Sequence, residues 1–310
     1  MHQKHPAPQK IFAGSFLRFS LKTILVCMLA SAFLPATKTM AATPGMDDPE
    51  TLAVMTFNLR FASPNPPHAW FQRRPVMQET IEKYSPDVIG TQEGLYQQLR
   101  NMDEDLPGYN WIGLGRAGGS RDEFMAVFYK TDRLEPLEFD HYWLSDTPSV
   151  IASITWDHHN KRMVTWVKFR DKKTDQEFYL KNTHFDHAVE QARVNASRLV
   201  MERINEWDTD LPILLIGDFN ATPGTSETFD VLVNQSDFVD TWDEAEVRRG
   251  EGLNTFHGYR EGPHEGERRI DWILSRGSVT SYETEIVTFK RDGQYPSDHF
   301  PVVTWLKIGE

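Results

Sequence analysis

Short runs that are apolar at most positions constrain the fold of this chain more than any other feature. They include "TLAVMTFNLRF" (51–61), "FMAVFYK" (124–130) and "LPILLIGD" (211–218), and the shorter "DVIGTQE" (87–93) is rich in β-forming residues. A strand with one wet face alternates apolar and polar residues, so a run that lacks this alternation predicts a strand buried on both faces. Two packed sheets with helices over their outer faces bury such strands.

The segments between these runs predict helices, one hairpin and two closing strands. Residues 75–84 and 189–204 carry apolar side chains at helical spacing, and a further helix is expected from Gly94 to about Glu104. The hairpin and the closing strands are "RMVTWVKFR" with "EFYLKNTHF" (162–170 and 177–185), "RRIDWILS" (268–275) and "FPVVTWLKI" (300–308). We therefore expect an α/β fold, a four-layer α/β sandwich of two packed mixed sheets flanked by helices, in one domain over residues 50–310.

The first residues have the pattern of an export signal rather than of the fold. Four basic residues precede an apolar stretch from Ile24 to Leu34, and small residues follow it near Ala41 and Ala42. The alternative is an uncleaved membrane anchor, but the stretch is shorter than the roughly 20 residues of a spanning helix. We expect residues 1–41 to be a signal peptide and the protein to be exported, periplasmic or extracellular, without stable membrane insertion after cleavage.

The single cysteine, Cys27, lies inside the apolar stretch of this signal. No small residue stands directly before it, as a lipoprotein signal would require. A chain cleaved near Ala41 therefore has no thiol. Disulfides, thiolate metal sites and a cysteine nucleophile are excluded for the mature protein.

The charge balance bears on the partners of this protein. The full chain carries a formal net charge of −12, and residues 1–41 hold five Lys or Arg and no acid, so the cleaved chain would carry −17. Such a field repels polyanions, whereas proteins that bind long nucleic acid usually have the opposite balance. Long nucleic acid is therefore an unlikely partner. A small phosphorylated substrate in a local basic pocket remains compatible, and no protein partner is inferred.

Polar residues recur at or just past the ends of the apolar runs. They are Asn58, Glu93, His184, Asp218, Asn220, Asp271, Asp298 and His299. Taken singly, most have a structural explanation: Asp218 and Asn220 suit a turn, Glu93 suits a helix start, and His184 suits a core position. A carboxylate inside the apolar "RRIDWIL" is costly without a partner. Strand ends on a rigid core gather distant residues into one site, and this recurrence predicts such a site.

Six blocks of the sequence, in this order, resemble the endonuclease/exonuclease/phosphatase superfamily of metal-dependent phosphohydrolases. They are "TFNLR" (56–60), "DVIGTQE" (87–93), "NTHFDH" (182–187), "GDFNATP" (217–223), "RIDWIL" (269–274) and "SDHFP" (297–301). The superfamily includes exonuclease III, deoxyribonuclease I, neutral sphingomyelinases and inositol polyphosphate 5-phosphatases. The resemblance implies a deoxyribonuclease I-like fold. The loops around residues 58–74, 113–119 and 142–148 are similar to a secreted bacterial branch.

The resemblance also implies a bound divalent cation, Mg²⁺ or Mn²⁺. Glu93 resembles the principal metal ligand, with Asn58 beside it. Asp298 resembles either a further metal ligand or a residue that contacts a ligand without touching the metal. Hard cations of this kind prefer carboxylate and amide oxygens and keep several waters, so few protein ligands are needed.

The remaining strand-end residues would carry the catalysis. By resemblance, Asp218 orients or deprotonates the attacking water, Asn220 holds the phosphate and His184 donates to a non-bridging oxygen. Asp271 would orient His299 near the scissile phosphorus. The resemblance does not decide between Asp218 and the Asp271–His299 pair as the general base.

Arginine and tryptophan side chains near these blocks are candidates for substrate binding. Arg74, Arg116 and Arg162 are expected beside the mouth of the site, where arginine is the preferred planar donor to phosphate, and Trp70 is expected to stack on the substrate. The alternatives are ion pairs with surface acids and a core position for the tryptophan. The predicted function is an exported metal-dependent phosphoesterase that hydrolyses a small phosphodiester or phosphomonoester. An extracellular nuclease and a catalytically inactive phosphate-binding module are the alternatives.

Overall fold

The computed structural model of the protein describes residues 48–309, except 208 and 267. The predicted signal peptide, with Cys27, lies outside the described residues. Residues 42–310 form one compact unit. In the described part of this unit the strands form two large sheets and one small two-stranded sheet of β3 (Gly94–Leu95) and β5 (Glu123–Phe124).

The first large sheet is mixed and has seven described strands. In order across the sheet they are β12 (Val247–Arg249), β14 (Val279–Ile286), β15 (Val302–Ile308), β1 (Leu52–Asn58), β2 (Val88–Gln92), β6 (Val127–Lys130) and β4 (Tyr109–Ile112). Strand β1 runs parallel to β2 and antiparallel to β15, so it lies near the middle of the sheet. All its residues are buried, as its apolar sequence predicts.

The second large sheet is also mixed and has six described strands. In order they are β11 (Val239–Asp240), β13 (Asp271–Arg276), β10 (Ile213–Asp218), β9 (Glu177–His184), β8 (Met163–Asp171) and β7 (Leu134–Trp143). Strands β8 and β9 form the expected hairpin, and β10 runs parallel to β9 and antiparallel to β13.

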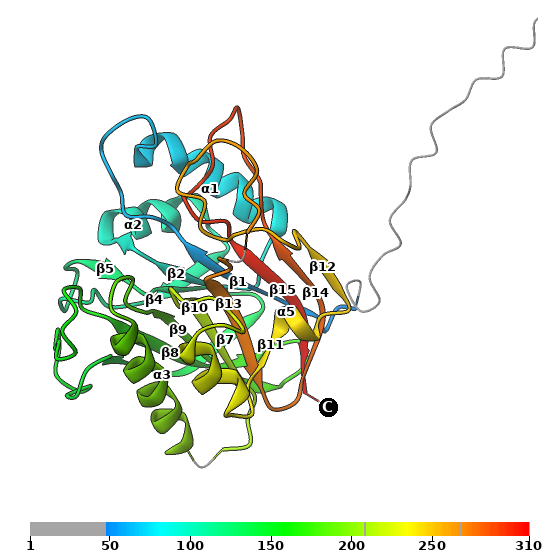
Figure 1. The fold of residues 1–310 in the computed structure, drawn as a ribbon. Coiled ribbons are helices and arrows are strands. Elements are labelled where there is room, and N and C mark those ends of the chain that lie inside the picture. Colours follow the sequence, from blue (N-terminus) through cyan, green and yellow to red (C-terminus); the bar gives the residue numbers. More distant parts are fainter. Residues whose placement is uncertain (1–47, 208, 267, 310) are drawn as a thin grey trace, which may run out of the picture. The chain divides into compact units, whose positions relative to one another are not determined.

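The two sheets pack face to face and helices cover their outer faces (Figure 1). The core between the sheets includes Val54 of β1, Leu180 of β9 and Ile216 of β10. Helices α1 (Trp70–Tyr84) and α2 (Tyr96–Asp105) pack on the outer face of the seven-stranded sheet. The outer face of the six-stranded sheet is covered by α3 (Glu190–Asn205), by the short α4 (Glu227–Phe229) and by a π-helical turn (Asp230–Asn234), while α5 (Thr241–Glu244) contacts strands of both sheets. The predicted four-layer α/β sandwich is confirmed.

Several boundaries differ from the sequence-based expectation, which also lacked the strands β3, β4, β7, β11, β12 and β14. Helix α1 begins at Trp70 rather than at Pro75, and the expected strand 124–130 is interrupted between β5 and β6. Strand β7 is an edge strand with a bulge after Pro136, and β14 is mostly polar, so neither contains an apolar run. None of the described helices is both long and apolar enough to cross a membrane.

A buried amide joins the two sheets beneath their strand ends. The Asn182 side chain of β9 donates through Nδ2 to the carbonyl oxygens of Thr91 and Ala126, both at 2.9 Å, and accepts through Oδ1 from Gln92 Nε2 at 2.7 Å. Residue 90 must be glycine for this approach, because a Cβ there would lie 2.8 Å from Asn182 Cγ. Gln92 directly precedes Glu93, and Asn182 lies two residues before His184. These bonds therefore fix two predicted site residues relative to each other.

Replacing Asn182 tests this connection. In Asn182→Ala the Thr91 carbonyl loses its donor in a buried position, and we expect the free energy of unfolding to fall by about 1–3 kcal/mol in urea denaturation. Asn110→Ala, on an exposed position of β4, is the matched control and should change it by less than about 0.5 kcal/mol. Equal losses in the two variants would show that the buried amide contributes nothing specific.

Candidate active site

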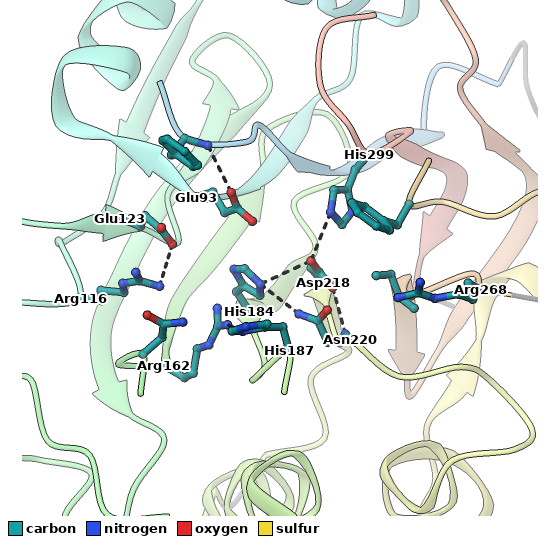
Figure 2. A pocket seen from close by; sticks show the side chains of 14 residues that line it. Glu93, Arg116, Glu123, Arg162, His184, His187, Asp218, Asn220, Arg268 and His299 are labelled. Atoms are coloured by element: carbon teal, nitrogen blue, oxygen red, sulfur yellow. Dashed lines mark hydrogen bonds and ion pairs between the residues drawn. The ribbon is translucent and has the colours of Figure 1, made fainter. Parts of the chain in front are cut away.

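The strand ends of both sheets open into one pocket of about 390 Å³ (Figure 2). Its lining combines acids, amides, imidazoles, arginines and two phenylalanines. The lining residues are Phe61, Glu93, Arg116, Glu123, Asn160, Arg162, His184, His187, Asp218, Asn220, Phe256, Arg268, Ile270 and His299. Five of the eight predicted strand-end residues therefore meet in one cavity: Glu93, His184, Asp218, Asn220 and His299. Asn58, Asp271 and Asp298 are not among its lining residues.

The carboxylate of Asp218 lies at the centre of the contacts. Its Oδ2 accepts from Asn58 Nδ2 at 3.0 Å and lies 3.4 Å from His184 Nε2 and 3.8 Å from His299 Nε2. Its Oδ1 accepts from the backbone N–H of Asn220 at 2.9 Å. Asp218 thus accepts two hydrogen bonds, from the Asn58 amide and the Asn220 backbone, and has an imidazole on either side of Oδ2.

Strand register brings Asp218 to this position. Asp218 pairs with His184 of β9 on one side and with Asp271 of β13 on the other. Gly217 permits the close packing of β10 on β9, because a Cβ at this position would lie 2.1 Å from the carbonyl oxygen of Thr183. The Gly-Asp pair at the end of the apolar run is therefore a requirement of the strand packing as well as of the site.

Asp271 and His299 form a hydrogen-bonded pair beside Asp218. His299 Nδ1 lies 2.9 Å from Asp271 Oδ2, and both side chains are buried. Burial lowers the pKa of His299, but the neighbouring carboxylates, Asp271 first, outweigh it and raise this pKa to about 10. Burial and the charge of Asp271 raise the pKa of Asp218 to about 7. These shifts favour the imidazolium form of His299 and make Asp218 a stronger base than an ordinary carboxylate.

His184 has the opposite character. Burial and the charges of Arg162 and Arg116 hold the pKa of His184 well below its usual value, so the ring is neutral. Its Nε2 accepts from Asn220 Nδ2 at 3.1 Å, which assigns the ring proton to Nδ1. This Nδ1 has no hydrogen-bond partner among the described residues. His184 can therefore act as a neutral hydrogen-bond donor.

Glu93 is the acid whose surroundings best suit a divalent cation. Its Oε1 accepts from Asn58 Nδ2 at 3.1 Å and its Oε2 from the backbone N–H of Phe61 at 3.2 Å. Both partners are neutral, and within residues 48–309 Glu93 makes no ion pair with Lys, Arg or His. A carboxylate that lines a pocket without a cationic partner fits Mg²⁺ or Mn²⁺, which take oxygen ligands and waters.

Two other acidic positions suit a cation less well. Ligand atoms of Asp218, Asp271 and His299 lie within 4.8 Å of one another, but the imidazolium already occupies the space between the two carboxylates. The carboxylate of Asp298 forms an ion pair with Arg60 at 2.7 Å and does not line the pocket. A cation at Asp298 would compete with that arginine.

Three residues that follow the strand ends have left-handed backbone conformations. The φ angles are 53° at Arg60, 61° at Glu93 and 50° at Asn220. L-residues other than glycine seldom adopt this conformation, and it costs on the order of 1 kcal/mol or more at each position. The three left-handed residues lie within two positions of the ends of β1, β2 and β10, where the chain leaves the sheets and enters the site.

Arg74 and Trp70 do not lie at the pocket, which corrects the expectation that both contact substrate. Arg74 pairs with Asp105 at 2.7 Å on α2, and Trp70 is buried with its Nε1 donating to Asn101. Because α1 begins at Trp70, both side chains belong to the helix and face α2. Arg116 and Arg162 do line the pocket.

Some pocket residues were not anticipated from the sequence. They are Phe61, Glu123, Asn160, His187, Phe256, Arg268 and Ile270. His187 and Ile270 belong to the blocks "NTHFDH" and "RIDWIL", so these motifs could have indicated them. The other five residues lie outside the six blocks, and no motif marked them. Burial is the main cause that raises the pKa of Glu123 to about 7, although this acid pairs with Arg116 Nη1 at 2.7 Å.

The charge coupling of the Asp271–His299 pair is testable by NMR. In Asp271→Asn the imidazolium loses its strongest anionic partner, so the pKa of His299, about 10 in the native protein, should fall by at least about one unit. Side-chain ¹⁵N or ¹³C shifts of labelled histidine, recorded against pH with chelator present, give this value. Asp132→Asn, on an exposed acid, is the control. An unchanged titration in Asp271→Asn would contradict the assignment.

Comparison with known proteins agrees with this geometry. The sequence model of the Endonuclease/Exonuclease/phosphatase family matches residues 55–299. A mannosyl-6-phosphatase of Bacteroides thetaiotaomicron VPI-5482 is 34% identical with a TM-score of 0.76, over 82% of this chain and 99% of that structure. An endonuclease/exonuclease/phosphatase of Bacteroides vulgatus is 30% identical with a TM-score of 0.79, over 84% and 99%.

A curated relative matches over a shorter stretch. Uncharacterized protein L388 of Acanthamoeba polyphaga mimivirus is 32% identical over 177 residues, which are 54% of this chain and 65% of the relative. The chain thus spans slightly less than two thirds of that relative's length. The family match over residues 55–299 and the two solved structures show that this chain belongs to the Endonuclease/Exonuclease/phosphatase family.

Proposed function

We propose that the protein is a metal-dependent hydrolase that cleaves an ester of a small phosphorylated substrate by attack of water at phosphorus. The observation that carries the proposal is Glu93, a carboxylate without an ionic partner among the described residues, in the same pocket as Asp218, His184 and His299. Membership of a family of phosphate-ester hydrolases supports the proposal.

The surroundings of Glu93 suit the cation that such hydrolysis needs. Glu93 would hold Mg²⁺ or Mn²⁺, which supplies Lewis-acid stabilisation of charge on the phosphoryl oxygens when bound. Asn58 would join it as a ligand only with its amide turned, because its Nδ2 faces Glu93 and its Oδ1 accepts from the Arg60 N–H. Asp298, paired with Arg60, would act from behind the site rather than as a direct ligand.

The remaining residues divide into donors and one acceptor. The His299 imidazolium would donate to a phosphoryl oxygen through Nε2, and a donor fixed before reaction stabilises the charge of the transition state. Asn220 Nδ2 already donates to His184 Nε2 and to the Phe185 carbonyl, and His184 Nδ1 is buried, so these two side chains would have to turn to donate as well. The raised pKa of His299 favours its protonated form, so it is poorly suited to accept a proton from water. Asp218, with its pKa raised to about 7, is the better group to orient the water and take its proton.

The size of the pocket and the net charge of the protein favour a small substrate. A cavity of about 390 Å³ accommodates a metabolite-sized ester, and the formal net charge of −12 opposes long nucleic acid. A relative of 34% identity is named a mannosyl-6-phosphatase, which acts within this size class by its name. Extracellular nuclease activity and a catalytically inactive binding module remain the two alternatives for experiment.

A panel of phosphate esters tests the function. Purified protein should hydrolyse at least one nucleotide, sugar phosphate or phospholipid head group in Mg²⁺ or Mn²⁺, and a chelator should abolish turnover. Preferred degradation of oligonucleotides would support the nuclease alternative. A folded protein that turns over no ester with either metal would support the binding module.

Glu93→Gln tests the metal ligand. Loss of this carboxylate should lower turnover by about 10²-fold or more and should weaken Mn²⁺ binding measured by calorimetry, with an unchanged far-UV spectrum. Glu82→Gln, on an exposed acid of α1, should leave both unchanged. Undiminished turnover and Mn²⁺ binding in Glu93→Gln would refute the ligand assignment.

We also propose that the protein is exported, on the basis of the sequence pattern of residues 1–41. The full chain expressed in a bacterial host should be recovered from the periplasm or medium with a new N-terminus near Ala41 or Ala42. A chain that begins at residue 42 should stay in the cytoplasm. Recovery of the full chain with residues 1–41 retained would contradict cleavage.

A further inference from the structure

Arg162 is a buried cation whose donors are incompletely used. The residue directly precedes β8 and its exposed fraction is 3%. Its Nη2 lies 3.2 Å from His187 Nδ1, and its Nε lies 3.5 Å from Asp186 Oδ2, too far for a hydrogen bond. Within the described residues, Nε and Nη1 have no hydrogen-bond partner. Unpaired donors on a buried guanidinium are costly, so their presence at a pocket wall indicates a ligand.

The ligand that these donors suit is an anion. A guanidinium presents a rigid fork of N–H groups that matches the oxygens of phosphate. Arg162 lines the same pocket as His184 and Asp218, and its charge acts on both of them. An anion bound at Arg162 therefore lies next to the groups proposed to act on phosphorus.

The wall around Arg162 is closed and cationic. Arg116 lies on the same side of the pocket, and its Nε and Nη1 pair with Asp122 at 2.9 Å and Glu123 at 2.7 Å (Figure 2). These two acids hold Arg116 in place and offset its charge, whereas Arg162 has only the more distant Asp186. Both arginines are buried, with exposed fractions of 7% for Arg116 and 3% for Arg162.

The opposite side of the pocket is open. Arg268 lies across the pocket from Arg116 and Arg162, with His184, Asp218 and Asn220 between them (Figure 2). Arg268 is exposed, and its guanidinium carbon lies 5.5 Å from the ring of Phe256. The exposed Arg268 marks the side on which we place the organic part of a substrate.

We propose that Arg162 binds the terminal oxygens of a phosphate monoester and makes the site selective for monoesters over diesters. This inference rests on the proposed function and specifies its substrate class. A monoester presents only non-bridging oxygens to the closed wall, while its alcohol part lies toward Arg268. A diester would direct its second carbon substituent at the buried guanidinium and leave the donors unpaired, which such sites reject strongly.

The reaction that this geometry supports is balanced by water alone. The oxygen of water forms a new bond to phosphorus, and the bond from phosphorus to the bridging ester oxygen breaks. The ester oxygen leaves with a proton as an alcohol, and inorganic phosphate remains beside Arg162. No oxidant, reductant or second substrate is needed.

The test compares one matched pair of substrates in two variants. With Mg²⁺ or Mn²⁺, the native protein should show a kcat/KM for p-nitrophenyl phosphate at least about 10²-fold above that for bis(p-nitrophenyl) phosphate. Arg162→Gln should lower kcat/KM for the monoester by about 10²-fold and that for the diester by less than about threefold. Arg162→Lys keeps the positive charge but lacks the planar guanidinium, so it should recover only part of the kcat/KM for the monoester. Arg248→Gln, on an exposed arginine that does not line the pocket, should leave the monoester-to-diester ratio unchanged.

Each outcome separates this inference from the proposed function. If the native protein hydrolyses neither substrate nor any other phosphate ester, the proposed function fails. If it hydrolyses both and Arg162→Gln lowers both equally, or if the native protein prefers the diester, the function stands and the role of Arg162 is overturned.

A binding measurement on the native protein covers the case in which the variants do not fold. Inorganic phosphate should inhibit the metal-loaded native protein at least about tenfold more strongly than dimethyl phosphate, because only the former offers free oxygens to every donor of the closed wall. Equal inhibition by the two anions would overturn the proposal.

Discussion

The register of strand β10 between its two neighbours is the constraint on which the site depends. Side chains two residues apart share one face of a strand, so Asp218 continues the row that Leu214 and Ile216 bury between the sheets. His184 continues the row of Leu180 in the same way, and Asn58 that of Val54. The site is thus the polar end of the core between the sheets, and a slip of one residue would turn its acid and imidazole to the opposite face. The apolar packing that stabilises the fold also sets the position of the catalytic groups.

The chain also uses buried polar contacts to hold the segments that follow the strands. Arg73 of α1 is fully buried and donates to five carbonyl oxygens, those of Leu59, Arg60, Phe61, His68 and Pro296. Such a cation is satisfied by peptide dipoles instead of by an acid. It joins the segment that follows Asn58 to the segment that precedes Asp298 and His299. Together with Asn182 beneath the strand ends, it limits how far the two halves of the site can separate.

The sequence was sufficient for the layers of the fold and for the residues at strand ends, and insufficient for the pocket wall. Apolar runs reveal buried strands, and a polar residue that ends such a run, like Asp218 or Glu93, stands out against them. Arg74 and Trp70 were misplaced because the N-cap residue of α1 is Ala69, which has no capping side chain to mark the helix start. Asn160 comes from a long loop and Glu123 from the two-residue strand β5, and neither position has a sequence pattern that gives a direction to its side chain. The unused donors of Arg162 depend on distances that no sequence pattern contains.

The left-handed conformation of Glu93 has a consequence for how this protein can change. Along β2 the alternation of faces would direct residue 93 with Ile89 toward the helices, and the φ of 61° turns its carboxylate to Asn58 instead. Glycine adopts this left-handed conformation without steric strain. A screen for heat resistance alone would therefore favour glycine at position 93, and the carboxylate would be lost. Selection for thermal stability and selection for catalytic activity would therefore favour different residues at position 93.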